Sequence, residues 1–506
     1  MRGQDAEGRE PIWAWVLAPF ATGSAFALAV AAYAVAHLAF RLAALPELGR
    51  DAVEDALSAQ SWSWGYLPGN PPLHTWLLRG LWLASGDLVA AEAVLHFGLL
   101  AATYLWLHRA ALAALGPGAR AGVAAALPSV TLVLGWDALT VYTHGVAGTA
   151  AFAFYLWRLM RLVAAPTIGR AAIAGAALGV VALAKYPTAG LALGLTAGLL
   201  LVPDARRAIT VPMRSALLLA TAAAIGPHAA WHLLLAPSVE SQAASPSALV
   251  ALATALAGVL APVLAVAALA WLAGPRLRAA WADGSATTAL RVLAAGGATA
   301  LAATVLAAAA VPMPSASAHH LVALPIVGAF LLGACLRGRG LAAVAAAILL
   351  CAATAFAIHA ARGVGALLPC DPCYLQRPYA AAAAALRADM PSGGTLVAPD
   401  ALTGGGVLAH LPGVRVAVPG YPVPPRRTGQ GPGACVVVTR AEVTVGGKQA
   451  RLRAVSQDFE AMAMRLAGVL AAASEDRREG RFPFHGGARG MLDLAWSVRP
   501  VAGDCR

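Results

Sequence analysis

Long apolar runs alternate with short polar segments along the first 362 residues of the chain. The runs consist mainly of Ala, Leu, Val and Gly, carry almost no charge, and repeatedly reach the roughly 20 residues that a helix needs to cross a bilayer. They lie near residues 18–43, 86–108, 118–135, 144–163, 170–186, 188–203, 213–235, 247–272, 289–311, 321–336 and 341–361. Continuous runs of this kind fit helices and not a β-barrel. The pattern therefore predicts a polytopic α-helical membrane protein with about 11 transmembrane helices.

Composition supports this interpretation, because 59% of the 506 residues are hydrophobic and only 12% are charged. Such a chain is too apolar for a water-soluble protein of this length. The net charge of +12 comes from basic residues in short clusters between the apolar runs, which indicates membrane topology and not nucleic-acid binding. The polar start, Met1 to Glu10, leads into an apolar stretch too long for the core of a cleavable signal peptide. The first helix is therefore expected to remain in the mature protein.

The distribution of arginines predicts the orientation. If the N-terminus is cytoplasmic, every inner loop is basic: these loops hold Arg109, Arg120, Arg158, Arg161, Arg170, Arg206, Arg207, Arg214, Arg276, Arg278, Arg291, Arg337 and Arg339. The opposite loops hold little beyond Arg50, Arg79 and Lys185. The positive-inside rule then predicts a multi-pass membrane protein with a cytoplasmic N-terminus. An odd number of spans places the C-terminal segment in the periplasm.

Residues 363–506 differ in character, since charge, Pro and Gly all rise there. Short β-like runs at 394–398, 414–418 and 435–439 alternate with helix-like runs at 380–388 and 459–473. This alternation is typical of a small soluble α/β domain. The chain is therefore expected to consist of a transmembrane domain, residues 1–362 with its first outer loop at 44–85, followed by a periplasmic α/β domain.

Cysteine usage agrees with an exported C-terminal domain. Cys370, Cys373, Cys435 and Cys505 fall in it, and the other two cysteines lie within predicted spans. Exported domains commonly contain disulfides, so two are expected among these four residues. The Cys-x-x-Cys pair at 370 and 373 leaves a redox or metal site as an alternative, although a lone pair is weak evidence for zinc.

The first outer loop carries three carboxylates directly after a predicted span. On a helix, Glu54 and Asp55 follow Asp51 by three and four residues, so all three can share one face. Neighbouring negative charge and partial burial raise the pKa of a carboxylate and suit it to act as a general base. The alternative is a solvated helix start, where acidic residues are favoured by the helix dipole.

The remainder of this loop mixes aromatic rings with amides and a rigid Pro-Pro pair, a combination that suits sugar binding. The residues concerned are Gln60, Trp62, Trp64, Tyr66, Asn70, Pro71, Pro72 and Trp76. Tryptophans also anchor proteins at membrane interfaces, and Trp62 and Trp76 are interpreted as such anchors.

These motifs resemble a known family, the bacterial members of the dolichyl-phosphate-mannose protein mannosyltransferases, which include the aminoarabinose transferases of lipid A. The matching residues of the first loop, in order and at near-equal spacing, are Asp51, Gln60, Trp64-Gly65-Tyr66, Pro71-Pro72-Leu73 and Trp76-Leu77. Gly179 to Tyr186 is similar to the family's Gly-x-x-x-Leu-x-Lys-Tyr. In the C-terminal segment, Cys370, Arg377, Pro378-Tyr379 and Gly394 to Ala398 also resemble some members.

The resemblance implies a GT-C fold and inverting transfer of a sugar from a polyprenyl-phosphate donor to a lipid, glycan or protein acceptor. It also implies that transfer takes place at the outer face of the bacterial cytoplasmic (inner) membrane. Asp51 would be the catalytic base, with Glu54 beside it. The chain departs from the family pattern at three positions: Ala52 stands where the family usually has a second acidic residue, Asn70 replaces a frequent His, and His144 replaces a frequent Asp. No cofactor is required by this chemistry, and a divalent metal ion is a candidate whose ligands the sequence does not identify.

A positive charge near the departing phosphate lowers the barrier to transfer. Lys185 is one of two lysines in the chain, and the topology places it at the outer interface beside Tyr186. Both residues, with His144, are candidates for binding the donor phosphate, while Asp137, His319 and His320 are candidates for binding substrate. Snorkelling of a lysine at a helix end and ordinary surface histidines are the alternatives.

Two other classes of function remain open. A transporter or flippase of lipid-linked saccharides would favour internal repeats and ionisable residues at mid-membrane, whereas the polar residues here collect in the outer loops. A structural scaffold with an exported domain would leave the acidic first loop unexplained.

Overall fold

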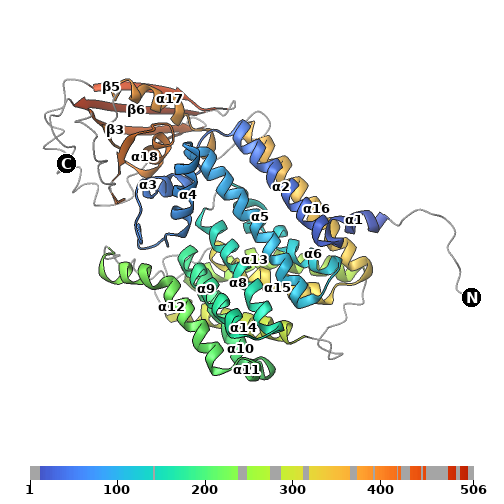
Figure 1. The fold of residues 1–506 in the computed structure, drawn as a ribbon. Coiled ribbons are helices and arrows are strands. Elements are labelled where there is room, and N and C mark those ends of the chain that lie inside the picture. Colours follow the sequence, from blue (N-terminus) through green and yellow to red (C-terminus); the bar gives the residue numbers. More distant parts are fainter. Residues whose placement is uncertain are drawn as a thin grey trace, which may run out of the picture.

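The computed structural model describes residues 12–140, 143–236, 248–273, 287–310, 318–364, 373–390, 394–418, 420–422, 434–445, 448–451, 477–485 and 490–499. A large helical part fills most of the molecule, and a six-stranded sheet lies at one end of it (Figure 1). The predicted combination of a polytopic helical region and a C-terminal α/β unit is thus confirmed.

Seven of the described helices are long and apolar enough to cross a membrane. They are α2 (Gly23–Ala44), α5 (Leu88–Leu115), α8 (His144–Ala164), α12 (Val211–Leu234), α13 (Ala248–Ala273), α14 (Thr288–Ala310) and α16 (Gly338–Gly363). Three shorter apolar helices are α9 (Ile168–Ala184), α10 (Tyr186–Leu201) and α15 (Ala323–Cys335). Each coincides with a run predicted from the sequence. Outward-facing leucines such as Leu218, Leu219 and Leu234 remain exposed, as expected for helices solvated by lipid.

The third predicted span, 118–135, is not a single straight helix. The chain forms α6 (Ala119–Ala126) and η1 (Leu127–Val130), then bends by 84° into η2 (Val133–Asp137) and α7 (Ala138–Thr140). The bend occurs at Thr131, whose backbone is extended. Its hydroxyl donates to the carbonyl of Pro128 at 2.7 Å and accepts from the amide of Leu134 at 3.3 Å. These bonds satisfy backbone groups that the interrupted helix leaves unpaired.

The helices α9 and α12 pack with their backbones in close approach. A methyl group added at Gly175 would lie 2.0 Å from the carbonyl oxygen of Leu217, and one at Gly179 would lie 2.5 Å from Cβ of Ala224. The hydroxyl of Thr221 donates to the carbonyl of Gly175 across the interface at 2.9 Å. Small residues four positions apart, with a hydroxyl bridging the helices, are typical of tight packing in membranes.

The remaining helices are short or connect the larger ones. They are α1 (Ile12–Ala21), α3 (Arg50–Ser58), α4 (Leu73–Ser85), α11 (Pro203–Ala208), η3 (Ala318–Leu321), η4 (Tyr374–Gln376), α17 (Tyr379–Arg387) and α18 (Ala401–Leu408). Both α3 and α4 lie in the segment between α2 and α5, residues 45–87, called the first loop below.

The sheet is mixed and has the strand order β2-β1-β3-β6-β5, with β4 pairing only with β3. Its strands are β1 (Gly394–Val397), β2 (Val414–Ala417), β3 (Ala434–Val445), β4 (Lys448–Arg451), β5 (Arg477–Pro483) and β6 (Gly490–Arg499). β1 is parallel to β2 and β3, and α18 provides the crossover from β1 to β2 that parallel pairing requires. The predicted strands at 394–398, 414–418 and 435–439 correspond to β1, β2 and β3, and the helix predicted at 459–473 lies outside the described residues.

The first loop and the sheet share one apolar core. Val53 and Leu57 of α3 and Leu78 of α4 are buried in the same cluster as Tyr379 of α17 and Val436 of β3. In Figure 1, α3 and α4 accordingly lie between the sheet and the other helices. This packing holds α3 in place from both sides.

Glu47 reinforces the same junction. It is fully buried, and its carboxylate accepts hydrogen bonds from the amide of Ala380 at 3.0 Å, Nε2 of His410 at 2.8 Å and Nε2 of His485 at 3.1 Å. The first loop and the C-terminal α/β unit are therefore joined by buried polar contacts as well as by apolar packing.

Candidate active site

A cavity of about 460 Å³ opens between the first loop and the ends of several helices. It is lined by Arg50, Asp51, Glu54, Asp55, Ser58, Tyr66, Leu67, Gly69, Asn70, Pro71, Thr75, His144, Lys185, Tyr186, Pro187 and His320. The carboxylates of α3 thus share one cavity with the cations of Arg50 and Lys185. This combination of a base and a positive charge is what a group transfer with an anionic leaving group needs.

Helix α3 presents its three acidic residues to this cavity, as their spacing predicts. Burial, with the charge of Asp55, raises the pKa of Asp51 above its ordinary value. Burial and the charges of Asp51 and Asp55 raise the pKa of Glu54 to about 7, although the hydroxyl of Tyr421 hydrogen-bonds to its carboxylate. Both carboxylates are therefore stronger bases than a solvated Asp or Glu.

Lys185 sits where α9 ends and α10 begins. Its backbone is extended, and its amide donates to the carbonyl of Val181 at 2.9 Å. Burial lowers the pKa of Lys185 to about 8, while Asp51 and Asp55 oppose that shift. The stem of the lysine packs on Gly148 of α8, because a methyl group there would lie 2.8 Å from Cβ of Lys185. A bound anion would stabilise the ammonium form of this partly desolvated amine.

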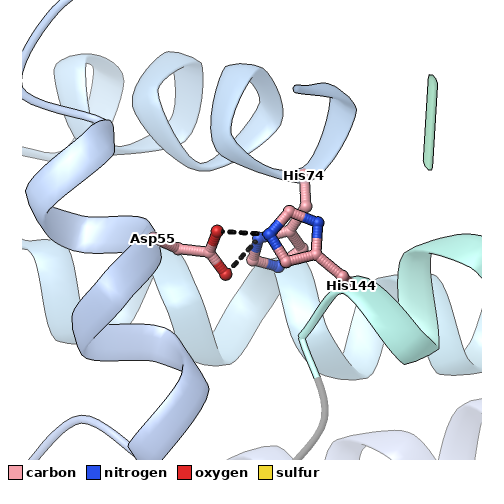
Figure 2. Close-up of side chains that lie close together, drawn as sticks. All are labelled: Asp55, His74 and His144. Carbon is pink, nitrogen blue, oxygen red and sulfur yellow. Dashed lines mark ion pairs between the residues drawn. The ribbon is translucent and has the colours of Figure 1, made fainter. Parts of the chain in front are cut away.

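Asp55, His74 and His144 form a buried cluster at the wall of the cavity, contributed by α3, α4 and the first residue of α8 (Figure 2). Oδ1 of Asp55 lies 2.7 Å from Nε2 of His144, and Oδ2 lies 3.0 Å from Nδ1 of His74. The hydroxyl of Thr75 also donates to Oδ1 of Asp55 at 3.2 Å. Burial alone would raise the pKa of Asp55, but His144 and His74 hold that pKa well below its ordinary value. Asp55 is therefore an anion and not a proton acceptor in this site.

Tyr186 belongs to a relay that leads to the first loop. Its hydroxyl lies 2.7 Å from Nε2 of His228 in α12, and Nδ1 of the same ring lies 2.7 Å from the carbonyl oxygen of Trp64. Because a carbonyl only accepts, Nδ1 of His228 carries the proton, and in the neutral ring Nε2 accepts from the tyrosine. The relay fixes the loop segment around Trp64 relative to the cavity.

Comparison with known proteins identifies this architecture. No protein-family model matches the chain, and no curated protein matches it. Two solved structures do: ArnT from Cupriavidus metallidurans bound to undecaprenyl phosphate, with TM-score 0.54 and 12% identity, and the same enzyme in the apo state, with TM-score 0.53 and 14% identity. Each comparison covers 93% of this chain and 98% of the ArnT chain. The chain has the ArnT fold. The GT-C fold implied by the sequence resemblance is thereby confirmed.

Within this ArnT fold, seven further residues singled out from the sequence line the same cavity as Asp51 and Glu54. They are Tyr66, Asn70, Pro71, His144, Lys185, Tyr186 and His320. Two of them have their polar groups engaged elsewhere, since the hydroxyl of Tyr66 donates to the carbonyl of Ser61 at 2.8 Å and Nε2 of His144 contacts Asp55. Burial and the charge of Lys185 lower the pKa of His320 to about 4. His320 is therefore a neutral imidazole.

Four predicted substrate-binding residues are not part of this lining. Gln60 donates to the carbonyl and accepts from the amide of Val416 in β2, each at 2.9 Å, so its amide fastens the first loop to the sheet. The ring of Trp64 is exposed and meets the ring of Trp76 edge-on. Pro72 caps α4, and Asp137 lies in η2. The side chain of His319 lies outside the described residues.

Of the four cysteines expected to form disulfides, Cys373 and Cys435 are disulfide-bonded. Cys370 and Cys505 lie outside the described residues. Cys335 and Cys351 are free thiols in α15 and α16.

The sequence analysis missed several residues that belong to the site, above all His74, Arg50 and Thr75. The signal for His74 and Thr75 was their place directly after Pro71-Pro72-Leu73, at the start of α4. Tyr421, which hydrogen-bonds to Glu54, comes from the C-terminal part of the chain and carried no signal in its surrounding sequence.

Proposed function

We propose that this protein is an inverting glycosyltransferase that moves a sugar from a polyprenyl-phosphate donor to a hydroxyl-bearing lipid, glycan or protein acceptor. The observation that carries the proposal is the placement of Asp51 and Lys185 in one cavity. The fold adds support, because ArnT has the same fold and has been solved bound to undecaprenyl phosphate.

In the proposed reaction, the carboxylate of Asp51 takes the proton of the acceptor hydroxyl. The acceptor oxygen then attacks the anomeric carbon of the sugar, and the bond between that carbon and the phosphate oxygen breaks. Polyprenyl phosphate leaves with the extra negative charge, which the ammonium group of Lys185 stabilises. Attack opposite the leaving group inverts the anomeric centre.

The raised pKa of Asp51 suits the first step, since a base is more effective when its pKa approaches the working pH. Glu54, held by Tyr421, lines the same cavity as Asp51 and is placed to orient the acceptor. Arg50 lines the same cavity and supplies a second positive charge for the phosphate.

The arginine-rich loops support an inner-membrane location with a cytoplasmic N-terminus. On that topology the first loop, the cavity and the sheet face the periplasm. Transfer then takes place at the outer face of the membrane, where the polyprenyl chain of the donor remains among the lipid tails.

The test is a transfer assay in proteoliposomes containing a polyprenyl-phosphate sugar labelled in the sugar and a membrane extract as acceptor. The expected result is labelled product together with free polyprenyl phosphate, and neither with the Asp51→Asn variant. Movement of intact labelled donor between leaflets, without cleavage, would instead identify a flippase. Mass spectra of cellular glycolipids with and without the gene would then reveal the sugar and the acceptor.

A further inference from the structure

Three buried side chains converge at the wall of the cavity from separate parts of the chain: Asp55, His74 and His144. Asp55 is 3%, His74 1% and His144 9% exposed. One oxygen or nitrogen of each lies within 4.8 Å of the corresponding atoms of the other two. Among the residues that the structure describes, no other group of three or more His, Cys, Asp or Glu side chains comes together in this way.

The orientation of these groups does not fit a simple network of hydrogen bonds. Oδ2 of Asp55 and Nδ1 of His74 are 3.0 Å apart, yet in the described part of the chain neither atom has an aligned hydrogen-bond partner. The ring nitrogen of His144 that faces the cluster, Nε2, lies 2.7 Å from Oδ1 of Asp55. Buried polar atoms without partners are costly. Two polar atoms that are close but do not point at each other are arranged like ligands directed at a common point.

The donor set matches a transition metal. Two imidazoles and one carboxylate form the three-ligand set of zinc sites that keep a fourth position open. Ligands about 2.0–2.2 Å from zinc in a tetrahedron are separated by roughly 3.3–3.5 Å, so small side-chain rotations of the present cluster suffice. Hard oxygen-binding ions such as Mg²⁺ are less suited, because two of the three donors are nitrogen.

Local charge also favours a cation here. Asp51, Glu54 and Asp55 all lie on α3 and line the same cavity. A divalent ion held by Asp55 would neutralise part of this negative charge, which an anionic donor would otherwise have to approach. Lys185 and Arg50 lie at the same cavity, and among the described contacts neither is bonded to Asp55.

We propose that Asp55, His74 and His144 bind one divalent transition-metal ion, with Zn²⁺ the preferred ion. Asp55 and His144 line the cavity, so the fourth position would be open toward it. If the proposed function holds, an oxygen of the donor phosphate would occupy that position. Metal binding itself does not depend on that function.

The test measures metal content and affinity directly. The protein is purified in detergent through a tag that contains no histidine, stripped with a chelator and titrated with Zn²⁺ against a metal indicator. We expect one ion per chain. Substitution with Co²⁺ should give the visible absorption bands of a tetrahedral site with nitrogen and oxygen ligands.

His74→Ala and His144→Ala should each weaken Zn²⁺ binding by more than the roughly 10- to 100-fold that loss of an outer-shell partner causes. His144→Asp, which restores a ligating oxygen, should recover part of the affinity. His228→Ala is the matched control, because His228 is buried nearby but belongs to the Tyr186 relay, and it should bind Zn²⁺ like the wild type. Size-exclusion profiles show whether each variant is folded.

Two results would overturn the inference. The first is that the folded wild-type protein binds Zn²⁺ no more tightly than the Asp55→Asn variant does. The other is undiminished binding in both histidine variants, which would place the ion elsewhere. If the histidine variants lose Zn²⁺ binding but keep transfer activity, the metal site is upheld and its role toward the phosphate is rejected. If the wild-type protein binds Zn²⁺ but has no transfer activity, the metal site is upheld and the glycosyltransferase proposal is rejected.

Discussion

Gly405 of α18 packs directly on the backbone of Val53 in α3, so closely that a methyl group added at Gly405 would lie 2.2 Å from the carbonyl oxygen of Val53. Helix α3 carries Asp51, Glu54 and Asp55. The close approach of α18 to the helix that carries these carboxylates therefore requires a residue without a side chain at position 405.

Gly405→Ala should destabilise the protein by about 1–3 kcal/mol, the usual cost of overpacking. Because the clash is with backbone, α3 must move, and transfer activity should fall as well. The measurements are the thermal unfolding midpoint in detergent and the transfer rate. Gly226→Ala in α12 is the control, since nothing lies within 4 Å of the added methyl group and alanine favours a helix. Equal stability of the two variants would contradict the role given to Gly405.

Asp51→Asn should lower the transfer rate by about 10²- to 10⁴-fold, the typical loss when a general base is removed. Asn keeps the shape of the side chain, so folding and donor binding should persist. Glu54→Gln should cost less, because Glu54 acts through Asp51 or the acceptor. Single-turnover kinetics with measured donor binding would separate the two effects. If Glu54→Gln is inactive while Asp51→Asn remains active, Glu54 and not Asp51 is the base.

The positions of the apolar helices and of Asp51 could be predicted because both depend on local sequence. A run of about 20 apolar residues has few alternatives to a membrane helix, and residues three or four apart on a helix share a face wherever that helix lies. The bend at Thr131 could not be predicted in the same way, because the apolar run continues through it. The hydroxyl of Thr131 stabilises the break through its hydrogen bonds to Pro128 and Leu134.

The other features that could not be predicted depend on contacts between segments that are distant in the sequence. The sequence presented Gln60 as a sugar-binding amide, but its two hydrogen bonds go to Val416, a residue 356 positions away. Conversely, the only local signal at His74 is its place after Pro71-Pro72-Leu73, and its partners Asp55 and His144 are brought beside it by the fold. Residue type alone indicates what a side chain can bind, whereas the fold decides which partner is present.

Lys185 should give the reaction an alkaline limit. Its pKa of about 8 means that the ammonium group loses its proton, and with it the charge that binds phosphate, as pH rises through that value. Donor kcat/KM should therefore be unaffected by this group below about pH 7 and fall above about pH 8, up to about tenfold per pH unit.

Lys185→Arg should remove this limit, because guanidinium stays charged, although altered geometry lowers the maximal rate. Lys185→Ala should be slower than Lys185→Arg at every pH below 8. The check is a pH profile of kcat/KM for all three proteins. If the wild type and Lys185→Arg lose activity at the same alkaline pH, another group is responsible for that loss. If the Ala and Arg variants have equal rates, Lys185 only snorkels to the membrane surface.

The C-terminal cysteines should resist alkylation in intact cells until a reductant is added. Cys373 and Cys435 are disulfide-bonded, and an exported location keeps them so. The measurement is labelling of whole cells with a membrane-impermeant maleimide, before and after reduction, followed by mass spectrometry of the tail peptides. Labelling of Cys373 without reductant would argue against an oxidised tail, and protection even after reduction would argue against export.

The close packing of α9 on α12 has a thermodynamic consequence for substrate binding. Lys185 directly follows α9, while His228 of α12 holds both Tyr186 and the carbonyl of Trp64. Because the two backbones are in close contact at Gly175 and Gly179, we expect the two helices to move as one body. A ligand that displaces the loop at Trp64 would then displace Lys185, the proposed phosphate-binding residue, with it. The free energies of binding the two substrates are then linked, and by reciprocity each substrate changes the affinity for the other by the same factor.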